Sequence, residues 1–358
     1  MKFANYDLCL ITDEKERLYL LGFASTDGYV IHGRTRTTLV IDKRYYYAAK
    51  KSLEPKGFEV VCGSDYSYLK DYILSCDVKV LGLDYSVTTV KQFDALKTLL
   101  PNISFYDIGG ELEYEASIKN PEEIKTIAKS CAIAEKSFLE IIPFIEEGVT
   151  EKDLAAELEY RFKKNGASDK SFDTIIAFGA NSAVPHHCTG KTKLKQNTPV
   201  LMDFGCIYNG YCSDMTRTLY FGTPNKEFLN AYKAVYDAHF AALNNIVAGM
   251  TGKEADALAR DVLERYGYAK YFTHSLGHGI GVHIHEYPYL APSRPGVLEE
   301  GMVFSDEPGV YFDGKFGIRI EDSCYLKDGK AHTFMKEDKR LIMIRDGEPV
   351  KVNQSEKQ

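Results

Sequence analysis

The sequence lacks several features that would assign it to a class at once. No apolar run approaches the roughly 20 residues that a membrane-spanning helix needs, so we expect no transmembrane segment. The formal net charge of −7 gives no basic excess, which argues against nucleic acid as a partner. The N-terminus has neither the apolar stretch nor the small-residue cleavage site of a signal peptide. The eight cysteines form no C-x-x-C pair, so we expect reduced cysteines and a cytoplasmic protein.

The length of the chain indicates two domains, because 358 residues are many for a single hydrophobic core. An α/β pattern comes first, and its texture changes where Asn120 and Pro121 cap and open a long helix. We therefore expect an α/β domain at residues 1–112 and a second domain at residues 113–358. In the first domain we predict strands at 6–11, 37–42, 58–62 and 78–84, and helices at 43–53 and 87–100.

The second domain contains a faint duplication. Four pairs of residues match at one common spacing: Gly148 and Gly249, Thr150 and Thr251, Lys152 and Lys253, Gly166 and Gly267. Each copy offers a threonine N-cap, an acid at N3 and a glycine C′ residue, so helix chemistry alone could produce part of the match. Each copy also follows a longer predicted helix and precedes a strand-rich segment. The helices are predicted at 120–147 and 225–248, and the strand-rich segments at 172–221 and 271–326. We expect one α+β domain with internal pseudo-two-fold symmetry.

A predicted hairpin at residues 198–222 carries two aspartates. Asn209-Gly210 is a strong two-residue turn signal, and such a turn pairs Asp203 with Thr216. Asp214 then lies one diagonal step from Asp203 on the same face, within reach of a shared ion or proton. Either aspartate alone is better explained as a turn cap or a solvated edge residue. Two on one face favour a functional role.

A second predicted hairpin, residues 301–326, carries two glutamates. Glu307 precedes Pro308-Gly309, and strand alternation in GIRIED puts Arg319 and Glu321 on one face. A buried glutamate needs a counter-charge or a metal. A plain Arg319–Glu321 ion pair is the simpler alternative, but it does not account for the other three carboxylates.

Four of the nine histidines lie in FTHSLGHGIGVHIHE, residues 272–286. Alone, this run fits metal ligands, acid–base groups or ordinary strand and loop residues. Carboxylates with one imidazole suit Mn²⁺, Co²⁺, Fe²⁺ or Zn²⁺, and several acidic ligands favour two ions over one. Two such ions can share a hydroxide that attacks a carbonyl, so we expect hydrolysis of an amide or ester. The spare histidines would then carry protons and stabilise an oxyanion.

Together these motifs resemble the M24 metallopeptidase family, which includes methionine aminopeptidase, aminopeptidase P and prolidase and has the pita-bread fold. The similarity rests on NSAVPHH, MDFGCIYNGYCSDMTRT, HSLGHGIGVHIHE, DEPGVY and GIRIED, in the family's order, and covers roughly residues 115–335. The segment LLGFASTDG…IDKRYYYAA is similar to the extra domain of the aminopeptidase P, prolidase and creatinase branch. Methionine aminopeptidases lack that domain. The resemblance implies an α/β N-terminal domain followed by an α+β pita-bread catalytic domain.

The resemblance also implies five metal ligands. Asp203 would chelate one ion, Asp214 and Glu321 would bridge both, and His278 and Glu307 would bind the other. The implied cofactor is a pair of divalent ions, with Mn²⁺ as first choice and Co²⁺, Zn²⁺ or Fe²⁺ as alternatives.

Other residues match the family's substrate cleft. His274 and His285 would line it, and His285 would stabilise the tetrahedral intermediate. His186 would close the site near the scissile bond, with His187 as the register alternative. The remaining roles are an orienting one for Arg319 towards the carboxylates and a proton shuttle for Glu307.

Two residues fall outside this scheme. Asp306 stands where the family more often has an apolar residue; strand alternation points it away from the metals, as a neutral variation or as a charge behind the ligand. His283, two residues before His285 on an expected strand, matches no motif position and is interpreted as a packed or solvated histidine.

The resemblance implies an Xaa-Pro aminopeptidase that releases the N-terminal residue from peptides with proline in second position, attacked by the metal-bridging hydroxide. The alternative is an Xaa-Pro dipeptidase (prolidase), and the remote alternative is an inactive pita-bread binding module. The implied partners are a proline-containing peptide and a second copy of the chain in a homodimer.

Overall fold

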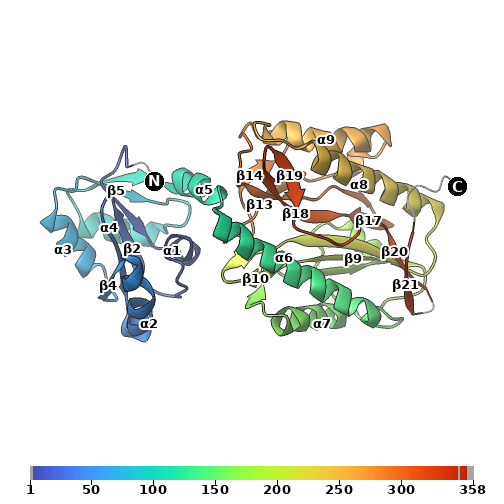
Figure 1. The fold of residues 1–358 in the computed structure, drawn as a ribbon, viewed down its shortest axis with the longest axis horizontal. Coiled ribbons are helices and arrows are strands. Elements are labelled where there is room, and N and C mark those ends of the chain that lie inside the picture. The colour runs from blue at the N-terminus through green and yellow to red at the C-terminus, as the bar shows by residue number, and fades with distance from the viewer. Residues whose placement is uncertain (1–2, 346, 353–358) are drawn as a thin grey trace. The chain divides into compact units, whose positions relative to one another are not determined.

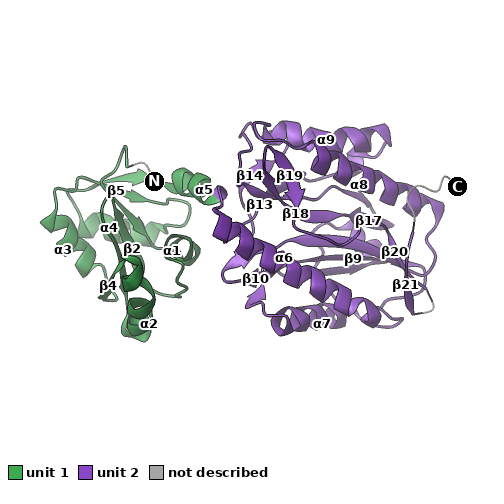
Figure 2. Cartoon of the chain, viewed as in Figure 1, with its two compact units in different colours: residues 1–116 green, residues 117–358 purple. Residues whose placement is uncertain are grey.

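The computed structural model describes residues 3–345 and 347–352, so the ends of the expected domains, residues 1–2 and 353–358, lie outside the described residues. The chain divides into two compact units, Met1–Ala116 and Ser117–Gln358 (Figure 2). Helix α5 (Gly109–Ser117) runs through the expected boundary after residue 112. The two compact units meet along the chain at the end of that helix.

Unit 1, in its described part, is built on a six-stranded mixed sheet with the strand order β4-β3-β2-β1-β5-β6. The strands are β1 (Leu8–Ile11), β2 (Tyr29–Gly33), β3 (Thr37–Ile41), β4 (Glu59–Cys62), β5 (Val80–Leu83) and β6 (Ser104–Asp107). The helices are α1 (Glu14–Leu21), α2 (Lys43–Leu53), α3 (Ser67–Ser75) and α4 (Val90–Leu99), with α5 at the end of the unit. The four predicted strands and two predicted helices are confirmed, and β2, β6, α1 and α3 are additional.

Alternation along β1 explains why both faces of this sheet are covered. Leu8 and Leu10 pack into one core with residues of α3 and α4. Cys9 and Ile11 pack into another core with residues of α1, α2 and α5. A β-strand directs successive side chains to opposite faces, so a strand buried on both faces reads as a continuous apolar run.

Unit 2 begins with a long helix that starts as predicted. Asn120 caps α6 (Pro121–Ile141) with a reciprocal capping box to Glu123. The helix ends earlier than the predicted residue 147, because Pro143 lacks the N–H needed to continue it. The segment Ile142–Phe144 forms a 3₁₀ turn instead.

The duplicated segments form matching helices, α7 (Glu151–Lys164) and α9 (Gly252–Arg265), each of 14 residues. Thr150 and Thr251 are the N-caps, and each closes a capping box with its N3 acid. The flanking glycines, Gly148, Gly166, Gly249 and Gly267, all have positive φ. The predicted cap chemistry is therefore confirmed in both copies. The helix α8 (Lys226–Asn245) precedes α9 as α6 precedes α7. Figure 1 shows α7 and α9 at opposite edges of unit 2.

The described strands of unit 2 form a ten-stranded sheet, a three-stranded sheet and a two-stranded ribbon. The main path of the large sheet is β14-β13-β15-β18-β12-β20-β21, and β9 pairs with both β12 and β8. The strands are β7 (Asp169–Lys170), β8 (Ile175–Phe178), β9 (Thr198–Phe204), β10 (Cys206–Tyr208), β11 (Tyr211–Cys212), β12 (Met215–Phe221), β13 (Gly277–Gly279), β14 (Glu286–Leu290), β15 (Val303–Asp306), β16 (Gly309–Phe312), β17 (Phe316–Arg319), β18 (Glu321–Lys327), β19 (Lys330–Thr333), β20 (Ile342–Arg345) and β21 (Glu348–Lys351).

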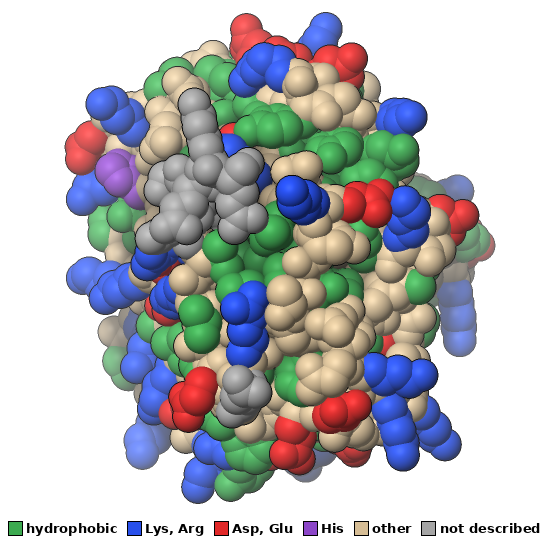
Figure 3. All heavy atoms as spheres, turned by 90° about the vertical axis from the view of Figure 1, so that its right-hand side faces the viewer, with side chains coloured by type: hydrophobic (Ala, Val, Ile, Leu, Met, Phe, Trp, Pro, Cys, Tyr) green, Lys and Arg blue, Asp and Glu red, His purple; other side chains and the backbone are tan. Residues whose placement is uncertain are grey.

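One face of the molecule carries acidic and basic side chains interspersed, with apolar side chains between them (Figure 3). No helix among the described residues is both long and apolar enough to cross a membrane.

Candidate metal centre and active site

The acidic hairpin has the predicted register. Tyr208 pairs with Tyr211, and Asn209 and Gly210 between them have φ of 48° and 85°, as a type I′ turn requires. Further down the same hairpin, Asp203 pairs with Thr216. The register is therefore the same at the turn and at Asp203, which places Asp214 diagonally opposite Asp203, as the Asn209-Gly210 turn predicts.

The second hairpin is two nested strand pairs, β15 with β18 outside and β16 with β17 inside. Ile318 and Ile320 are fully buried in the core that contains α8 and α9. Arg319 and Glu321 point the other way, and Glu321 pairs with Thr216 of β12. The predicted alternation is confirmed, and it brings Glu321 beside the aspartate hairpin.

These strands bring three candidate ligands together. One ligand atom from each of Asp214, His278 and Glu321 lies within 4.8 Å of the others. The Nε2 of His278 is 3.5 Å from Asp214 Oδ2 and 3.5 Å from Glu307 Oε1, so Glu307 adjoins the same cluster. Ser305 binds both Glu307 and His278: its hydroxyl donates to the Glu307 carboxylate and accepts from the backbone N–H of His278.

Arg319 ties the fifth candidate ligand, Asp203, to this group. Its Nη2 donates to Asp203 Oδ2 at 2.6 Å and its Nε to the hydroxyl of Thr216 at 3.0 Å. The Thr216 hydroxyl donates in turn to Glu321 Oε2 at 2.5 Å. The side-chain ion pair of Arg319 is thus with Asp203 rather than the Glu321 pair considered as the simpler alternative. Arg319 reaches Glu321 through Thr216.

Burial and mutual repulsion act on the carboxyl groups of this cluster. Burial raises the pKa of Asp214 well above its ordinary value, and the nearby Asp203 and Glu307 raise it further. Burial, followed by the charge of Asp214, does the same to the pKa of Glu321. Burial is also the main cause that raises the pKa of Glu307 to about 8. A concentration of carboxylates this costly requires either protons or cations.

The donor set fits divalent cations. Within residues 3–345 and 347–352, the buried Asp203 Oδ1 and Asp214 Oδ1 have no hydrogen-bond partner. Burial, with the adjacent His285, lowers the pKa of His278 to about 4, so its imidazole is neutral and able to coordinate. Carboxylate oxygens with one imidazole nitrogen form a hard ligand set suited to first-row divalent ions.

The metal-free protein is expected to lose stability as the pH rises from about 6.5 to about 8. The folded-state pKa of Glu307 is about 8 and its ordinary value is 4.5, so between these values the folded state keeps a proton that the unfolded state releases. Below about pH 6.5 the lowered pKa values of His278 and His274 act in the opposite direction, since these rings bind protons only in the unfolded state there. The stability that protonated Glu307 contributes is lost as the pH passes through 8. The melting temperature with a chelator should fall by at least about 2–4 °C, the shift for about 1 kcal/mol in a domain of this size. Excess Mn²⁺ should abolish the slope, and an unchanged slope would contradict the ligand assignment.

His274 and Tyr311 lie beside the carboxylates. The Nε2 of His274 is 2.9 Å from the hydroxyl of Tyr311, which accepts from Arg319 Nη1 at 2.6 Å. Burial, followed by the positive charge of Arg319, lowers the pKa of His274 to about 3, so its ring is neutral at pH 7. Sequence reasoning assigned no role to Tyr311 or Thr216. Tyr311 lies within the quoted DEPGVY motif, but strand alternation alone does not distinguish it from a core tyrosine.

The structure distinguishes His186 from its register alternative. His187 Nε2 is 3.0 Å from the fully buried carboxylate of Glu151. His186 lies close enough to His274 to contribute to the lowering of the pKa of His274. His186 is therefore the member of the pair that lies near His274, whereas His187 is bound to Glu151.

The expectation that His283 and His285 lie on a strand is wrong. Strand β13 ends at Gly279 and β14 begins at Glu286, with bends between them. The ring of His285 contacts that of His278, with centroids 4.2 Å apart. The backbone N–H of His283 donates to Glu286, which also forms a buried ion pair with Lys119. The Glu286 carboxylate thus holds the backbone of this loop at His283. Because the loop is not a strand, alternation does not decide which way His283 and His285 point.

Asp306 points away from the candidate ligands, as predicted, and joins a second set of buried charges. Its Oδ2 is 3.1 Å from Nδ1 of His239 on α8, and it pairs across the strands with Asp322. Asp322 accepts from Arg217 and from Lys339, each at 2.8 Å. Burial alone would raise the pKa of Asp322, but these two cations outweigh it and hold that pKa far below its ordinary value. A buried ionic network therefore lies behind β18, which begins with Glu321, and behind the end of β15, which Glu307 follows.

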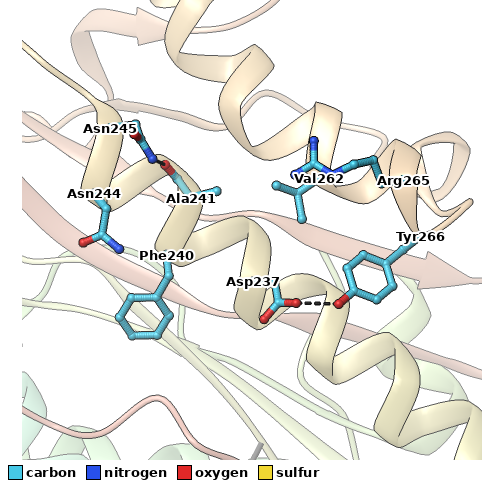
Figure 4. A pocket seen from close by; sticks show the side chains of 8 residues that line it. All are labelled: Asp237, Phe240, Ala241, Asn244, Asn245, Val262, Arg265 and Tyr266. Carbon is cyan, nitrogen blue, oxygen red and sulfur yellow. Dashed lines mark hydrogen bonds between the residues drawn. The ribbon is translucent and has the colours of Figure 1, made fainter. Parts of the chain in front are cut away.

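A separate hollow of about 440 Å³ lies between α8 and α9 (Figure 4). Figure 4 shows the hydroxyl of Tyr266 turned towards Asp237, and the two form a hydrogen bond. The remaining lining residues are Phe240, Ala241, Asn244, Asn245, Val262 and Arg265. Since these include none of the candidate ligands or histidines, the hollow is distinct from the candidate metal centre.

Comparison with known proteins assigns both units. Metallopeptidase family M24 matches residues 125–328, and the creatinase/prolidase N-terminal domain matches residues 1–114. The structure is similar to Xaa-Pro dipeptidase from Bacillus anthracis, with 36% identity, a TM-score of 0.91 and coverage of 95% of this chain and 96% of that one. It is also similar to X-Pro aminopeptidase from Thermotoga maritima MSB8, with 32% identity, a TM-score of 0.89 and coverage of 95% and 98%.

Comparison of the sequences alone also finds Xaa-Pro peptidases. A putative Xaa-Pro aminopeptidase of Mycoplasma pneumoniae is 38% identical over 327 residues, which are 91% of each chain. The expected architecture, an α/β creatinase-type domain followed by a pita-bread catalytic domain, is confirmed. The chain belongs to metallopeptidase family M24.

Proposed function

We propose that the chain is an Xaa-Pro aminopeptidase with two divalent metal ions. The observation that carries the proposal is the convergence of four carboxylates and one imidazole on one place that is buried at Asp214 and Glu321 and half-buried at the other three: Asp203, Asp214, His278, Glu307 and Glu321. Five oxygen and nitrogen ligands accept Mn²⁺, our first choice, as well as Co²⁺, Zn²⁺ or Fe²⁺. The full set argues against an inactive binding module, for which we would expect several of these residues to be missing.

The bound ions would activate a shared water molecule as nucleophile and polarise the scissile carbonyl. Glu307 is the proton carrier in this scheme, because it is a half-buried carboxyl group beside His278. Arg319 keeps Asp203 and, through Thr216, Glu321 in fixed orientations. The three histidines act on the substrate: His186 and His274 line the cleft, and His285 stabilises the developing oxyanion.

Metal titration of the purified protein tests this proposal. Metal-free protein should hydrolyse an Xaa-Pro-Xaa tripeptide only after addition of a divalent ion, with saturation near two ions per chain for the two-metal site proposed. If neither Mn²⁺ nor Co²⁺ produces hydrolysis, the binding-module alternative replaces the enzyme.

Substrate length distinguishes the proposed aminopeptidase from an Xaa-Pro dipeptidase, which the comparisons support equally. An aminopeptidase accepts residues after proline, whereas a dipeptidase cleft closes on the carboxylate of proline. We expect kcat/KM for an Xaa-Pro-Xaa tripeptide to exceed that for Gly-Pro at least about tenfold, equivalent to about 1.4 kcal/mol. A preference for the dipeptide would identify a prolidase.

We also propose that the protein is a cytoplasmic homodimer in which each chain combines an N-terminal domain of about residues 1–112 with a catalytic domain over the rest of the chain. Light scattering coupled to size-exclusion chromatography tests the oligomeric state. A mass of one chain, 40.3 kDa, would contradict the dimer.

A further inference from the structure

The loop that carries His186 is held at its base by a carboxylate that belongs to no metal site. Glu151, the first residue of α7, is fully buried. Its Oε1 accepts from the N–H of Phe178 at 2.9 Å and from the amide of Asn181 at 2.7 Å. Its Oε2 accepts from the N–H of Gly190 at 2.9 Å and lies 3.0 Å from His187 Nε2. One side chain thus joins both ends of the loop around His186.

The segment that carries His274 is held in the same manner from α9. Asp256 lies in the first turns of that helix and is 1% exposed. Its Oδ1 accepts from the N–H of Leu276 at 3.0 Å, and both of its oxygens bind Arg260. Arg260 donates to the carbonyl oxygens of Phe272 and of His274 itself, at 3.1 and 3.0 Å. The backbone on both sides of His274 is therefore tied to one buried carboxylate.

The two arrangements belong to the two halves of the duplication. Helices α7 and α9 carry matching threonine caps, and each presents one buried acid to a loop that contains a candidate catalytic histidine. The acids stand at different positions, the first residue of α7 and the fifth of α9. Neither acid takes part in the N-cap of its helix, because the threonine hydroxyls accept from the backbone N–H of the N3 residues Asp153 and Glu254. A buried carboxylate is costly unless it is fully hydrogen-bonded, so its bonds to loop backbone define the loop conformation closely.

We propose that Glu151 and Asp256 are positioning residues that act through His186 and His274, respectively. This inference rests on the proposed function. Loops are intrinsically more mobile than the elements they connect, and a displacement of about 1 Å in a catalytic group can lower the rate about 100-fold. The duplicated helices supply one rigid anchor for each histidine.

Amide substitutions at the two anchors test the proposal. In Glu151→Gln the amide nitrogen replaces one of the oxygens and cannot accept a hydrogen bond, and in Asp256→Asn the charge opposite Arg260 is lost. The matched control is Glu157→Gln, which breaks a half-exposed Glu157–Arg161 ion pair on the same helix α7. Single-turnover hydrolysis of an Xaa-Pro-Xaa tripeptide is measured with excess Mn²⁺-loaded enzyme. We expect each anchor variant to lose about 10- to 100-fold in rate with unchanged metal content, and the control to stay within about twofold.

Combination with histidine variants separates positioning from general damage. If Asp256 acts through His274, Asp256→Asn should slow the His274→Ala enzyme by less than about twofold. Glu151→Gln should likewise add little to His186→Ala. Full losses in the alanine backgrounds, or anchor variants as active as the control, would overturn the proposal.

Hydrogen exchange gives a second readout that does not depend on the reaction. Glu151→Gln should speed exchange in residues 178–190 while residues 272–276 exchange as in the wild type, and Asp256→Asn should do the reverse. Faster exchange throughout unit 2 in either variant would make the acid a general structural residue and contradict positioning. A wild type that hydrolyses no Xaa-Pro peptide would refute the proposed function but leave this exchange pattern as the test of the anchors.

Discussion

Replacing Asp214 or Glu321 by alanine is expected to abolish peptide hydrolysis and metal retention while unit 1 stays folded. Both carboxylates lie in the cluster with His278, and each would bridge two ions in the proposed site. Removal of a bridging ligand weakens both ions at once, so the loss should exceed the roughly 10- to 100-fold effect typical of a residue behind the ligands. Activity on a tripeptide and metal content by atomic emission are the measurements.

Two additional observations make this experiment decisive. Hydrogen exchange of β1 to β6 should match the wild type, because unit 1 has its own cores and shares none of these residues. Glu264→Ala, which removes an exposed carboxylate from α9, should change neither activity nor metal content. Turnover close to wild type in either ligand variant would refute the two-metal proposal.

Local signals in the sequence were sufficient for the parts of the site that depend on turns and caps. Asn209-Gly210 fixes the hairpin register because both residues adopt positive φ, and the positions of Asp203 and Asp214 follow. The threonine caps at Thr150 and Thr251 similarly fix where α7 and α9 begin. In these cases the information lies within a few residues of the feature it determines.

The parts that the sequence did not predict depend on tertiary contacts or on weak local patterns. Arg319 binds Asp203 because β9 and β17 both approach Thr216, which no local pattern reveals. His239 and Lys339 meet Asp306 and Asp322 from distant segments. The loop before Glu286 contains alternating residues like a strand, but a buried carboxylate rather than a ladder holds it. In unit 1, β6 is an edge strand with exposed ends, so its apolar pattern is faint.

Arg217→Met is expected to reduce the free energy of unfolding of unit 2 by about 3–5 kcal/mol, the cost of breaking a buried ion pair from one side. Arg217 and Asp322 are 3% and 0% exposed, so water cannot replace the guanidinium. The same guanidinium also donates to the carbonyl oxygens of Thr216 and Glu321. The variant should therefore loosen β12, which follows Asp214, and β18, which begins with Glu321, as well as the network itself.

Exchange rates of the β12 and β18 amides measure this loss in unit 2 alone, which matters because the chain has no tryptophan to report on one unit optically. Lys233→Met is the matched control: it breaks a partly exposed Lys233–Asp237 pair on α8 and should cost less than about 1 kcal/mol. Equal effects of the two substitutions would contradict the network.

The double variant Arg217→Met with Asp322→Leu identifies the origin of the cost. We expect most of the loss in the free energy of unfolding to come from the Asp322 carboxylate, which stays buried beside fewer cations in Arg217→Met. In that case the double variant, which lacks this carboxylate, should be more stable than Arg217→Met alone. In the double variant the network keeps one cation, Lys339, and one acid, Asp306. In the native protein His239 lies between Asp306 and Asp322. If the double variant is instead less stable than the single one, the Asp322 carboxylate still stabilises unit 2 through its other partners, Lys339 among them. The cost of Arg217→Met then lies mainly in the lost bonds to the carbonyl oxygens of β12 and β18. In that case the loss of Arg217 should lower metal affinity in proportion to stability.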